Sequence, residues 1–129
     1  MKRNGFSLLE LMIVIAVIAI TLAWAVPSYN ESVRKARRGE AQSKMREFEV
    51  CAARSYTVNS NFDSVAADCD PDDDDYYVYA VNDAALTYTV TATPKGSQTA
   101  DKCGTMTLVQ TGAATAAVAG CWASNQVSS

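Results

Sequence analysis

A single carboxylate stands at the front of a long apolar segment. Glu10 is followed by residues 11–26, of which only Thr21 is clearly polar. At about 1.5 Å per residue, the 21 residues from Phe6 to Val26 are long enough to cross the roughly 30 Å apolar core of a bilayer. A carboxylate in such a helix costs about 2.5–3.5 kcal/mol at its centre and less near its end. Glu10 therefore predicts a cationic partner.

Three further carboxylates, on Asp68, Asp70 and Asp72, have the alternate spacing of a calcium-binding loop. The EF-hand form of that loop requires Gly where this chain has Asp73, and Glu where it has Tyr79. Calcium accepts flexible oxygen ligands, so a calcium site of another geometry stays open as the less favoured interpretation. We expect a solvated acidic loop, with no metal and no cofactor.

The four cysteines lie outside the apolar segment and include no C-x-x-C pair. In an exported chain, an even set predicts two disulfides and an oxidising compartment, whereas a zinc ribbon or a thioredoxin-type site is disfavoured. Three pairings are open. We favour Cys51–Cys69 with Cys103–Cys121, because this is the local pairing. Each bond would close a short loop and stabilise a small domain by about 3 kcal/mol.

Composition and charge argue against several function classes. The chain has 129 residues and no histidine, which removes histidine bases and most zinc sites. We find no nucleophile–base pair or phosphate-binding loop in the sequence, and we expect no enzyme activity. From Ser55 onward, two lysines stand against nine aspartates, a net charge of −7 that repels phosphate. We therefore do not expect nucleic acid as a partner.

Apolar periodicity extends the expected helix beyond the apolar segment. Two stripes with helical steps of three and four follow it: Tyr29, Val33 and Ala36, then Ala41, Met45, Phe48 and Ala52. We expect one helix over residues 6–54, with residues 6–26 as its membrane or filament-core part. The stripes are offset across Gly39, so we expect the first to face neighbouring molecules and the second the globular domain. Pro27 lacks an amide proton and predicts a kink or local melting over residues 21–27.

The apolar period then changes to the alternation of a sheet. Residues 76–81, 86–93 and 105–109 are rich in β-branched and aromatic side chains, and one face of the second segment carries Leu86, Tyr88, Val90 and Ala92. Residues 82–85 fit a hairpin turn, and residues 55–75 a polar connection. The expected fold class is α+β, with an antiparallel sheet of three to four strands over residues 55–129 packed on the upper helix.

Two ordinary interpretations of the apolar segment compete with a more specific one. Ala23-Trp24-Ala25 is typical of a secretory cleavage site, and an uncleaved segment would be a single membrane anchor. Lys2 and Arg3 would keep the amino end cytoplasmic. Both interpretations leave Glu10 without a partner.

The stretch "KRNGFSLLELMIVIAVIAI", running into "VPSYNESVRKARRGEA", resembles the amino-terminal segment of type IV pilins and type II secretion pseudopilins. The shared motif is a short basic leader, then Gly5, Phe6, a hydroxyl residue, two apolar residues and Glu10. The resemblance is close from Lys2 to about Ala41 and looser beyond. It implies the type IV pilin fold, in which a long hydrophobic helix packs on a small antiparallel sheet.

The resemblance also implies a processing route. A prepilin peptidase would remove the leader, residues 1–5, by cutting between Gly5 and Phe6, and would methylate the new amine of Phe6. That amine stays a cation, and in pilins it is thought to pair with Glu10 of the neighbouring subunit and so set the register of the filament. The alternative is a contact between Phe6 and Glu10 of one chain, which are four residues apart.

The implied function is that of a structural subunit of a type IV pilus, which serves adhesion, motility or DNA uptake. Its partners would be other pilin subunits and the pilus assembly machinery, first in the bacterial inner membrane and then in a surface filament. A type II secretion pseudopilin, or a membrane-anchored or secreted monomeric binding domain, remains an alternative. The sequence does not separate a major from a minor subunit.

Two further expectations follow from the family. The run "CGTMTL…GCW" resembles the carboxyl-terminal part of small type IVa and minor pilins, which supports the Cys103–Cys121 bond. The basic residues between Arg34 and Arg38 are either a solvated helix face or a surface that pairs with acidic groups of adjacent subunits.

Overall fold

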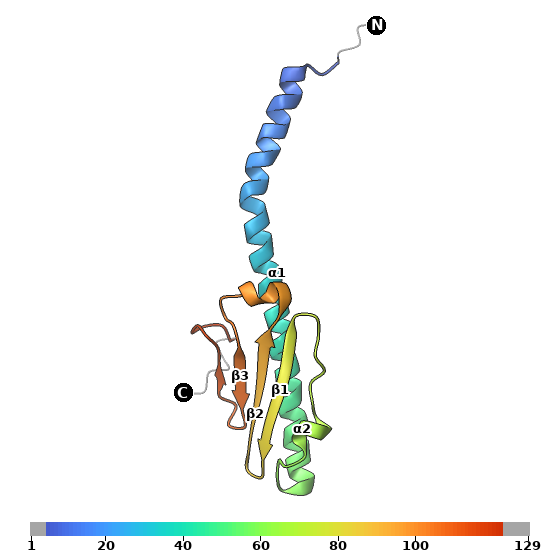
Figure 1. Ribbon diagram of the computed structural model, residues 1–129, viewed down its shortest axis with the longest axis vertical. Coiled ribbons are helices and arrows are strands. Elements are labelled where there is room, and N and C mark those ends of the chain that lie inside the picture. The colour runs from blue at the N-terminus through green and yellow to red at the C-terminus, as the bar shows by residue number, and fades with distance from the viewer. Residues whose placement is uncertain (1–4, 123–129) are drawn as a thin grey trace. The chain divides into compact units, whose positions relative to one another are not determined.

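The computed structural model describes residues 5–122, so the expected leader lies outside the described residues except for Gly5. The chain forms two compact units, Met1–Val33 and Arg34–Ser129. Figure 1 labels most of the elements. In chain order they are α1 (Leu8–Asn59), α2 (Val65–Asp68), β1 (Tyr77–Ala84), β2 (Thr87–Pro94), the 3-10 helix η1 (Gly96–Ala100), β3 (Met106–Val109) and β4 (Ala114–Thr115). Both units include part of α1.

The first unit is the apolar part of α1. The helix begins after Ser7, whose hydroxyl oxygen accepts a hydrogen bond from the backbone N–H of Glu10 at 3.1 Å, as at a helix N-cap. The helix continues through Pro27 without interruption. The local melting expected over residues 21–27 is therefore wrong, because the proline removes a single backbone donor and the surrounding turns keep theirs. The helix kink expected at Pro27 stays a prediction.

In the second unit, α1 buries one apolar stripe. Ala41, Met45, Phe48 and Ala52 are 0–2% exposed, which confirms the stripe predicted from the sequence. The helix ends at Asn59, five residues later than expected. It stops where Ser60 adopts a positive φ of 58°, a left-handed conformation that ends the run of helical hydrogen bonds.

The sheet has four antiparallel strands in the order β1-β2-β3-β4, as the fold class predicted. β1 pairs with β2 from Tyr77 opposite Pro94 to Ala84 opposite Thr87. The turn between them is therefore residues 85–86, and the hairpin turn expected at residues 82–85 was placed too early. Leu86 lies in this turn and is 70% exposed. The prediction that it shares the buried face of β2 is therefore wrong.

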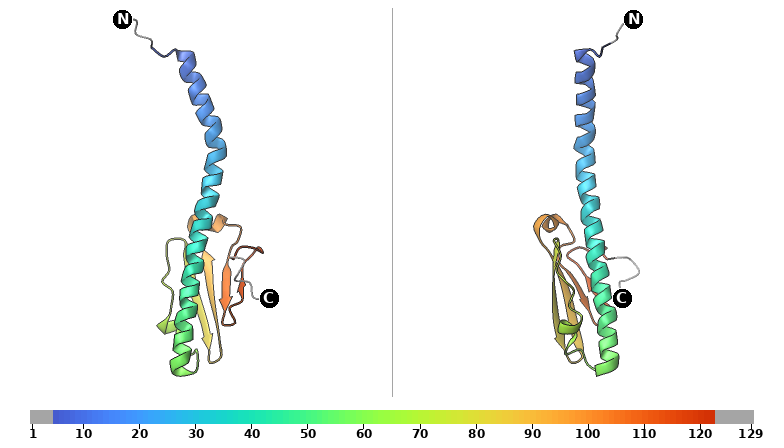
Figure 2. Two further views of the ribbon diagram at one scale, coloured as in Figure 1. Left: turned by 180° about the vertical axis from the view of Figure 1, so that it is seen from behind. Right: turned by 90° about the vertical axis from the view of Figure 1, so that its right-hand side faces the viewer.

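The core lies between one face of the sheet and the buried stripe of α1. Figure 2 (right) shows the strands lying along one side of the helix. Alternate strand residues point inward, and the edge of the Phe48 ring meets the ring of Tyr88 at a centroid distance of 5.1 Å. The buried strand residues are Tyr77, Tyr79, Tyr88, Val90, Ala92, Met106 and Leu108.

We predict that this tyrosine-rich core limits stability at high pH. Burial, with a smaller contribution from nearby Glu49, raises the pKa of Tyr88 to about 12, against about 10 for a tyrosine in an unfolded chain. A group whose pKa is raised on folding stabilises the protein below its unfolded pKa, and this contribution is lost as the pH rises through the folded value. The free energy of unfolding should therefore fall from about pH 10 to about pH 12.

Urea unfolding at a series of alkaline pH values checks this prediction. The variant Tyr88→Phe should lose less stability across this range than the wild type, because it has no phenol to ionise there. Tyr29→Phe is the matched control, since Tyr29 is 70% exposed. Equal alkaline losses in Tyr88→Phe and the wild type would contradict the assignment.

Candidate assembly and binding surfaces

The first unit exposes a surface that is apolar on all sides. Over its most apolar window of 18 residues, α1 has a mean hydropathy of 2.6 and no buried residue, so by length and composition it can cross a membrane. Phe6 is 80% exposed, and Glu10, four residues later, is also exposed. A helix that is apolar all round needs lipid or other helices to cover it.

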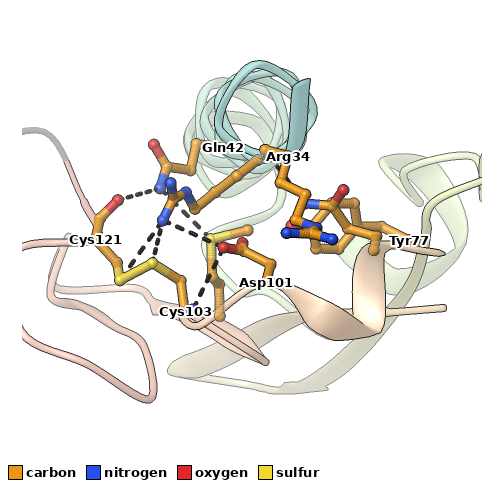
Figure 3. A network of polar contacts seen from close by, with 9 residues as sticks. Arg34, Gln42, Tyr77, Asp101, Cys103 and Cys121 are labelled. Atoms are coloured by element: carbon orange, nitrogen blue, oxygen red, sulfur yellow. Dashed lines mark hydrogen bonds and ion pairs between the residues drawn. A yellow bond between two sulfur atoms is a disulfide. The ribbon is translucent and has the colours of Figure 1, made fainter. Parts of the chain in front are cut away.

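In the second unit, a buried ion pair lies between α1 and the segment after η1. The side chains of Arg38 and Asp101 are 8% and 1% exposed, and their charged atoms lie 3.5 Å apart. The Arg38 guanidinium also contacts the sulfur of Cys103 and lies 3.8 Å from that of Cys121 (Figure 3). One member of the basic cluster is therefore engaged within its own unit rather than displayed to neighbours.

Hydrogen bonds to the backbone extend this network in both directions. Gln42 Nε2 donates to the carbonyl oxygen of Cys121 at 2.8 Å. Gln98, which is fully buried, donates through Nε2 to the carbonyl oxygen of Arg34 at 2.9 Å and to the hydroxyl of Tyr77 at 3.0 Å. Burial raises the pKa of Tyr77, so its phenol stays neutral in this network. The network thus fastens η1 and the carboxyl-terminal segment to α1.

Sequence analysis missed Gln98 and Asp101 as structural residues. They lie in the polar stretch between the predicted strand segments 86–93 and 105–109, and no periodic signal marks them. Only the folded chain shows that this stretch crosses α1 beside Arg38.

The two disulfides are those favoured from the sequence. Cys51 is joined to Cys69, and Cys103 to Cys121, with a Cα–Cα distance of 5.8 Å in each. The first joins α1 to the residue that follows α2. Next to the second bond, Gly104 and Gly120 have positive φ angles of 53° and 83°, a conformation that favours glycine. The "CG" and "GC" pairs of the sequence therefore mark backbone turns at this bond.

The aspartate-rich residues 68–75, which we name the acidic connection, do not gather their carboxylates as a metal site. Within residues 5–122, no group of three His, Cys, Asp or Glu residues is arranged to hold a metal ion, so Asp68, Asp70 and Asp72 do not form the calcium triad considered above. Asp74 instead accepts hydrogen bonds from the backbone N–H groups of Tyr76 and Tyr77 and pairs with Lys44 at 3.0 Å.

These contacts decide the charge state of Asp74. Partial burial works to raise the pKa of Asp74, but the Lys44 ammonium and the two amide donors outweigh it and lower the pKa below its usual range. Asp74 is therefore a charged cap at the start of β1 rather than a free carboxylate.

A basic and aromatic cluster lies at the same end of the sheet. The Arg37 guanidinium lies 3.7 Å from the centre of the Tyr76 ring and donates to the hydroxyl of Ser97 at 3.2 Å. The backbone N–H of Lys95 donates to the carbonyl oxygen of Tyr76. Arg37 thus contacts Tyr76 through its side chain and Lys95 contacts it through its backbone, and we name these three residues the Tyr76 cluster.

Residues 27–107, more than half of the chain, match the family described as type IV minor pilin ComP, DNA uptake sequence receptor. The chain belongs to the ComP family of type IV minor pilins. Residues 1–26 match the prokaryotic N-terminal methylation motif. The pilin resemblance drawn from the sequence is thereby confirmed, and the family adds the minor class, which the sequence did not separate.

The chain is also similar to curated fimbrial proteins over a short segment and to a solved pilin structure in fold. The type IV major fimbrial protein FimA of Dichelobacter nodosus is 44% identical over 41 residues, 32% of this chain and 26% of that protein. FimA of strain VCS1703A gives the same identity over 25% of its length. The match thus spans about a quarter of these relatives. A type IV pilin from Shewanella oneidensis has the same fold, with a TM-score of 0.62, 22% identity, and coverage of 70% of this chain and 98% of that one.

We predict that removing one partner of the buried ion pair destabilises the second unit strongly. Asp101→Ala leaves the Arg38 charge buried without a counter-ion, which should lower the free energy of unfolding by about 3–5 kcal/mol. Replacing both partners, as in Arg38→Met with Asp101→Leu, should cost less than the single change because no charge stays buried.

Urea unfolding of the full chain in detergent with both disulfides intact measures these losses. Asp63→Ala is the control, because Asp63 is exposed, and its effect should stay within about 0.5 kcal/mol. An Asp101→Ala protein as stable as the control would show that the pair does not hold the unit together.

Proposed function

We propose that this minor pilin is a structural, non-catalytic subunit of a type IV pilus. The observation that carries the proposal is the exposed apolar segment with one carboxylate near its start, within a match to the N-terminal methylation motif. In the proposed route, the segment holds the precursor in the inner membrane, the peptidase cuts between Gly5 and Phe6, and Phe6 is methylated. The assembly machinery then moves the chain into a surface filament with other pilins.

The electrostatics of the segment give Glu10 its proposed role. An isolated carboxylate in apolar surroundings is costly, whereas a carboxylate beside an ammonium group costs much less. Cleavage creates that ammonium at Phe6. Pairing between Glu10 of one subunit and the Phe6 amine of the next satisfies both charges only in the correct axial register. The contact within one chain is the competing arrangement, and a pseudopilin or an anchored monomeric domain is the competing function.

A second candidate function is DNA capture, which the family description favours. The charge argument against nucleic acid counted only residues after Ser55. The folded second unit begins at Arg34 and carries nine basic and twelve acidic residues, a net charge of −3 rather than −7. Three of these carboxylates, on Glu49, Asp74 and Asp101, are paired with basic side chains. We propose that the Tyr76 cluster contributes to phosphate binding, since the Arg37 guanidinium lies over the Tyr76 ring and a second basic residue, Lys95, is hydrogen-bonded to Tyr76 through its backbone.

We predict that Glu10→Val separates processing from assembly. The mature wild-type protein should have lost residues 1–5 and gained one methyl group, as measured by mass spectrometry. Glu10→Val should show the same mass, but its amount in sheared surface fibres should fall about tenfold, the effect of losing roughly 1.4 kcal/mol of pairing.

Two controls define this experiment. Thr21→Val changes one polar residue of the same segment and should assemble normally, whereas a bulky residue at Gly5 should leave unprocessed precursor in the membrane. A mature chain beginning at Val26 would refute the pilin route, and normal fibres from Glu10→Val would remove the register role.

We predict that Lys95→Glu weakens binding of the full chain in detergent to double-stranded DNA about tenfold, through loss of one phosphate contact and added repulsion. Fluorescence anisotropy at a fixed salt concentration measures this. Lys102→Glu makes the same charge change on an exposed residue outside the Tyr76 cluster and should bind like the wild type. Equal weakening in both variants would assign the effect to net charge alone.

A further inference from the structure

The apolar segment of α1 ends with two exposed aromatic side chains. Trp24 is 81% exposed, and Tyr29, just beyond the segment, is 70% exposed. At the end of a membrane-spanning helix, tryptophan and tyrosine favour the level of the lipid head groups. Val33, the last residue of the first unit, lies about 6 Å along α1 from Tyr29. Because Arg34 is bonded to Val33, the second unit begins within about 10 Å of the head-group level, the Debye length in 0.1 M salt.

The second unit begins with basic residues. Lys35 is exposed on α1, and Arg37 is half-buried two residues later. Arg37 donates to the hydroxyl of Ser97 in η1, and Lys95 directly precedes η1, so folding brings Lys95 to the same end of the unit. Figure 1 shows η1 in orange beside α1. We name Lys35, Arg37 and Lys95 the proximal basic residues.

The charges of these three residues are available to a ligand. Within residues 5–122, no carboxylate forms an ion pair with any of them. The adjoining η1 (Gly96–Ala100) has no charged side chain that would repel an anion. Glu31, Glu40 and Asp75 are exposed and close in sequence to basic residues, so the net charge of this end is small. The proximal basic residues are therefore suited to bind individual phosphate groups at short range rather than to create a broad positive field.

The arrangement around α1 favours lipid as the source of these phosphates. Lys35 and Arg37 are two residues apart, so they lie about 200° apart around the helix. A DNA duplex that binds on one side of α1 contacts one of them. Head groups surround a helix that crosses a bilayer on all sides, so they reach both. Lysine and arginine also extend their long side chains toward head groups from the ends of such helices.

We propose that the phosphates of anionic phospholipid head groups bind the proximal basic residues while the chain is anchored in the membrane. This inference rests on the proposed membrane stage and needs no second copy of the chain. Arg37 and Lys95 also belong to the Tyr76 cluster. Lipid therefore occupies part of that cluster until the chain leaves the membrane, and the proposed DNA capture is confined to the assembled filament.

Amine acetylation of the full chain in nanodiscs tests this contact. The discs contain phosphatidylcholine alone, or phosphatidylcholine mixed with phosphatidylglycerol, and peptide mass spectrometry follows a neutral acetylating reagent at each lysine. Lys35 and Lys95 should react about fivefold more slowly in the anionic discs, the effect of roughly 1 kcal/mol per basic residue near an anionic surface. Lys44 is the internal control, because it is paired with Asp74, and its rate should not change.

Variants of two arginines separate head-group binding from a general effect of the anionic surface. Arg37→Gln should weaken the slowing at Lys95, because the two residues share the bound phosphates, whereas Arg37→Lys should preserve most of it. Arg54→Gln is the matched control, since Arg54 is exposed on α1 outside the proximal basic residues. It should react like the wild type at both lysines.

The outcomes that contradict the proposal are distinct. Equal rates in the two kinds of disc, equal slowing at Lys44, or undiminished slowing in Arg37→Gln would each overturn it. Protection of Lys95 by duplex DNA but not by phosphatidylglycerol would assign the Tyr76 cluster to nucleic acid alone. A chain that fails to insert into either kind of disc would instead defeat the proposed membrane stage, and this inference with it.

Discussion

The structure depends on how a single helix covers its apolar side chains. In the second unit, α1 is apolar along one stripe, and the sheet covers that stripe completely. In the first unit, α1 is apolar on all sides, and none of residues 5–122 buries it. The two units therefore reach their stable states separately: the second can fold on its own contacts, while the first depends on whatever surrounds it. A chain of this kind can pass from lipid to a bundle of like helices without refolding its sheet.

Arg38 interrupts the buried side of α1 with a charge, and its surroundings explain how the unit tolerates it. A buried ion pair seldom adds much stability compared with apolar residues of the same volume, because both charges lose their hydration. The contribution of this pair is to fix the position of neighbouring segments relative to α1. Together with Gln42 and Gln98, the pair holds α1 against η1 and against the segment around Cys121, which have few apolar side chains of their own. The network and the Cys103–Cys121 bond thus place Cys121 beside α1 (Figure 3). The ring of the next residue, Trp122, lies 5.4 Å from the Arg46 guanidinium of the same helix.

Local patterns made part of this structure predictable. The stripe from Ala41 to Ala52 and the alternation of β2 are repeated over several residues, so the helix and the central strand could be located from sequence. The end of β1 could not, because residues 82–85 have turn-forming composition, yet the register with β2 carries the strand to Ala84. The partners of Arg38 were equally hidden, since they are more than sixty residues away. The charge argument was incomplete for a related reason: it divided the chain at Ser55, whereas folding joins the helical arginines to the sheet.

The bond between Cys51 and Cys69 has a consequence for proteolysis. It encloses the end of α1, the turn at residues 60–64 and all of α2. A protease that cleaves this turn would separate nothing, because the helix and the rest of the second unit would still be covalently joined. Such a nicked molecule would keep its mass, apart from the added water, until a reductant opened the bond.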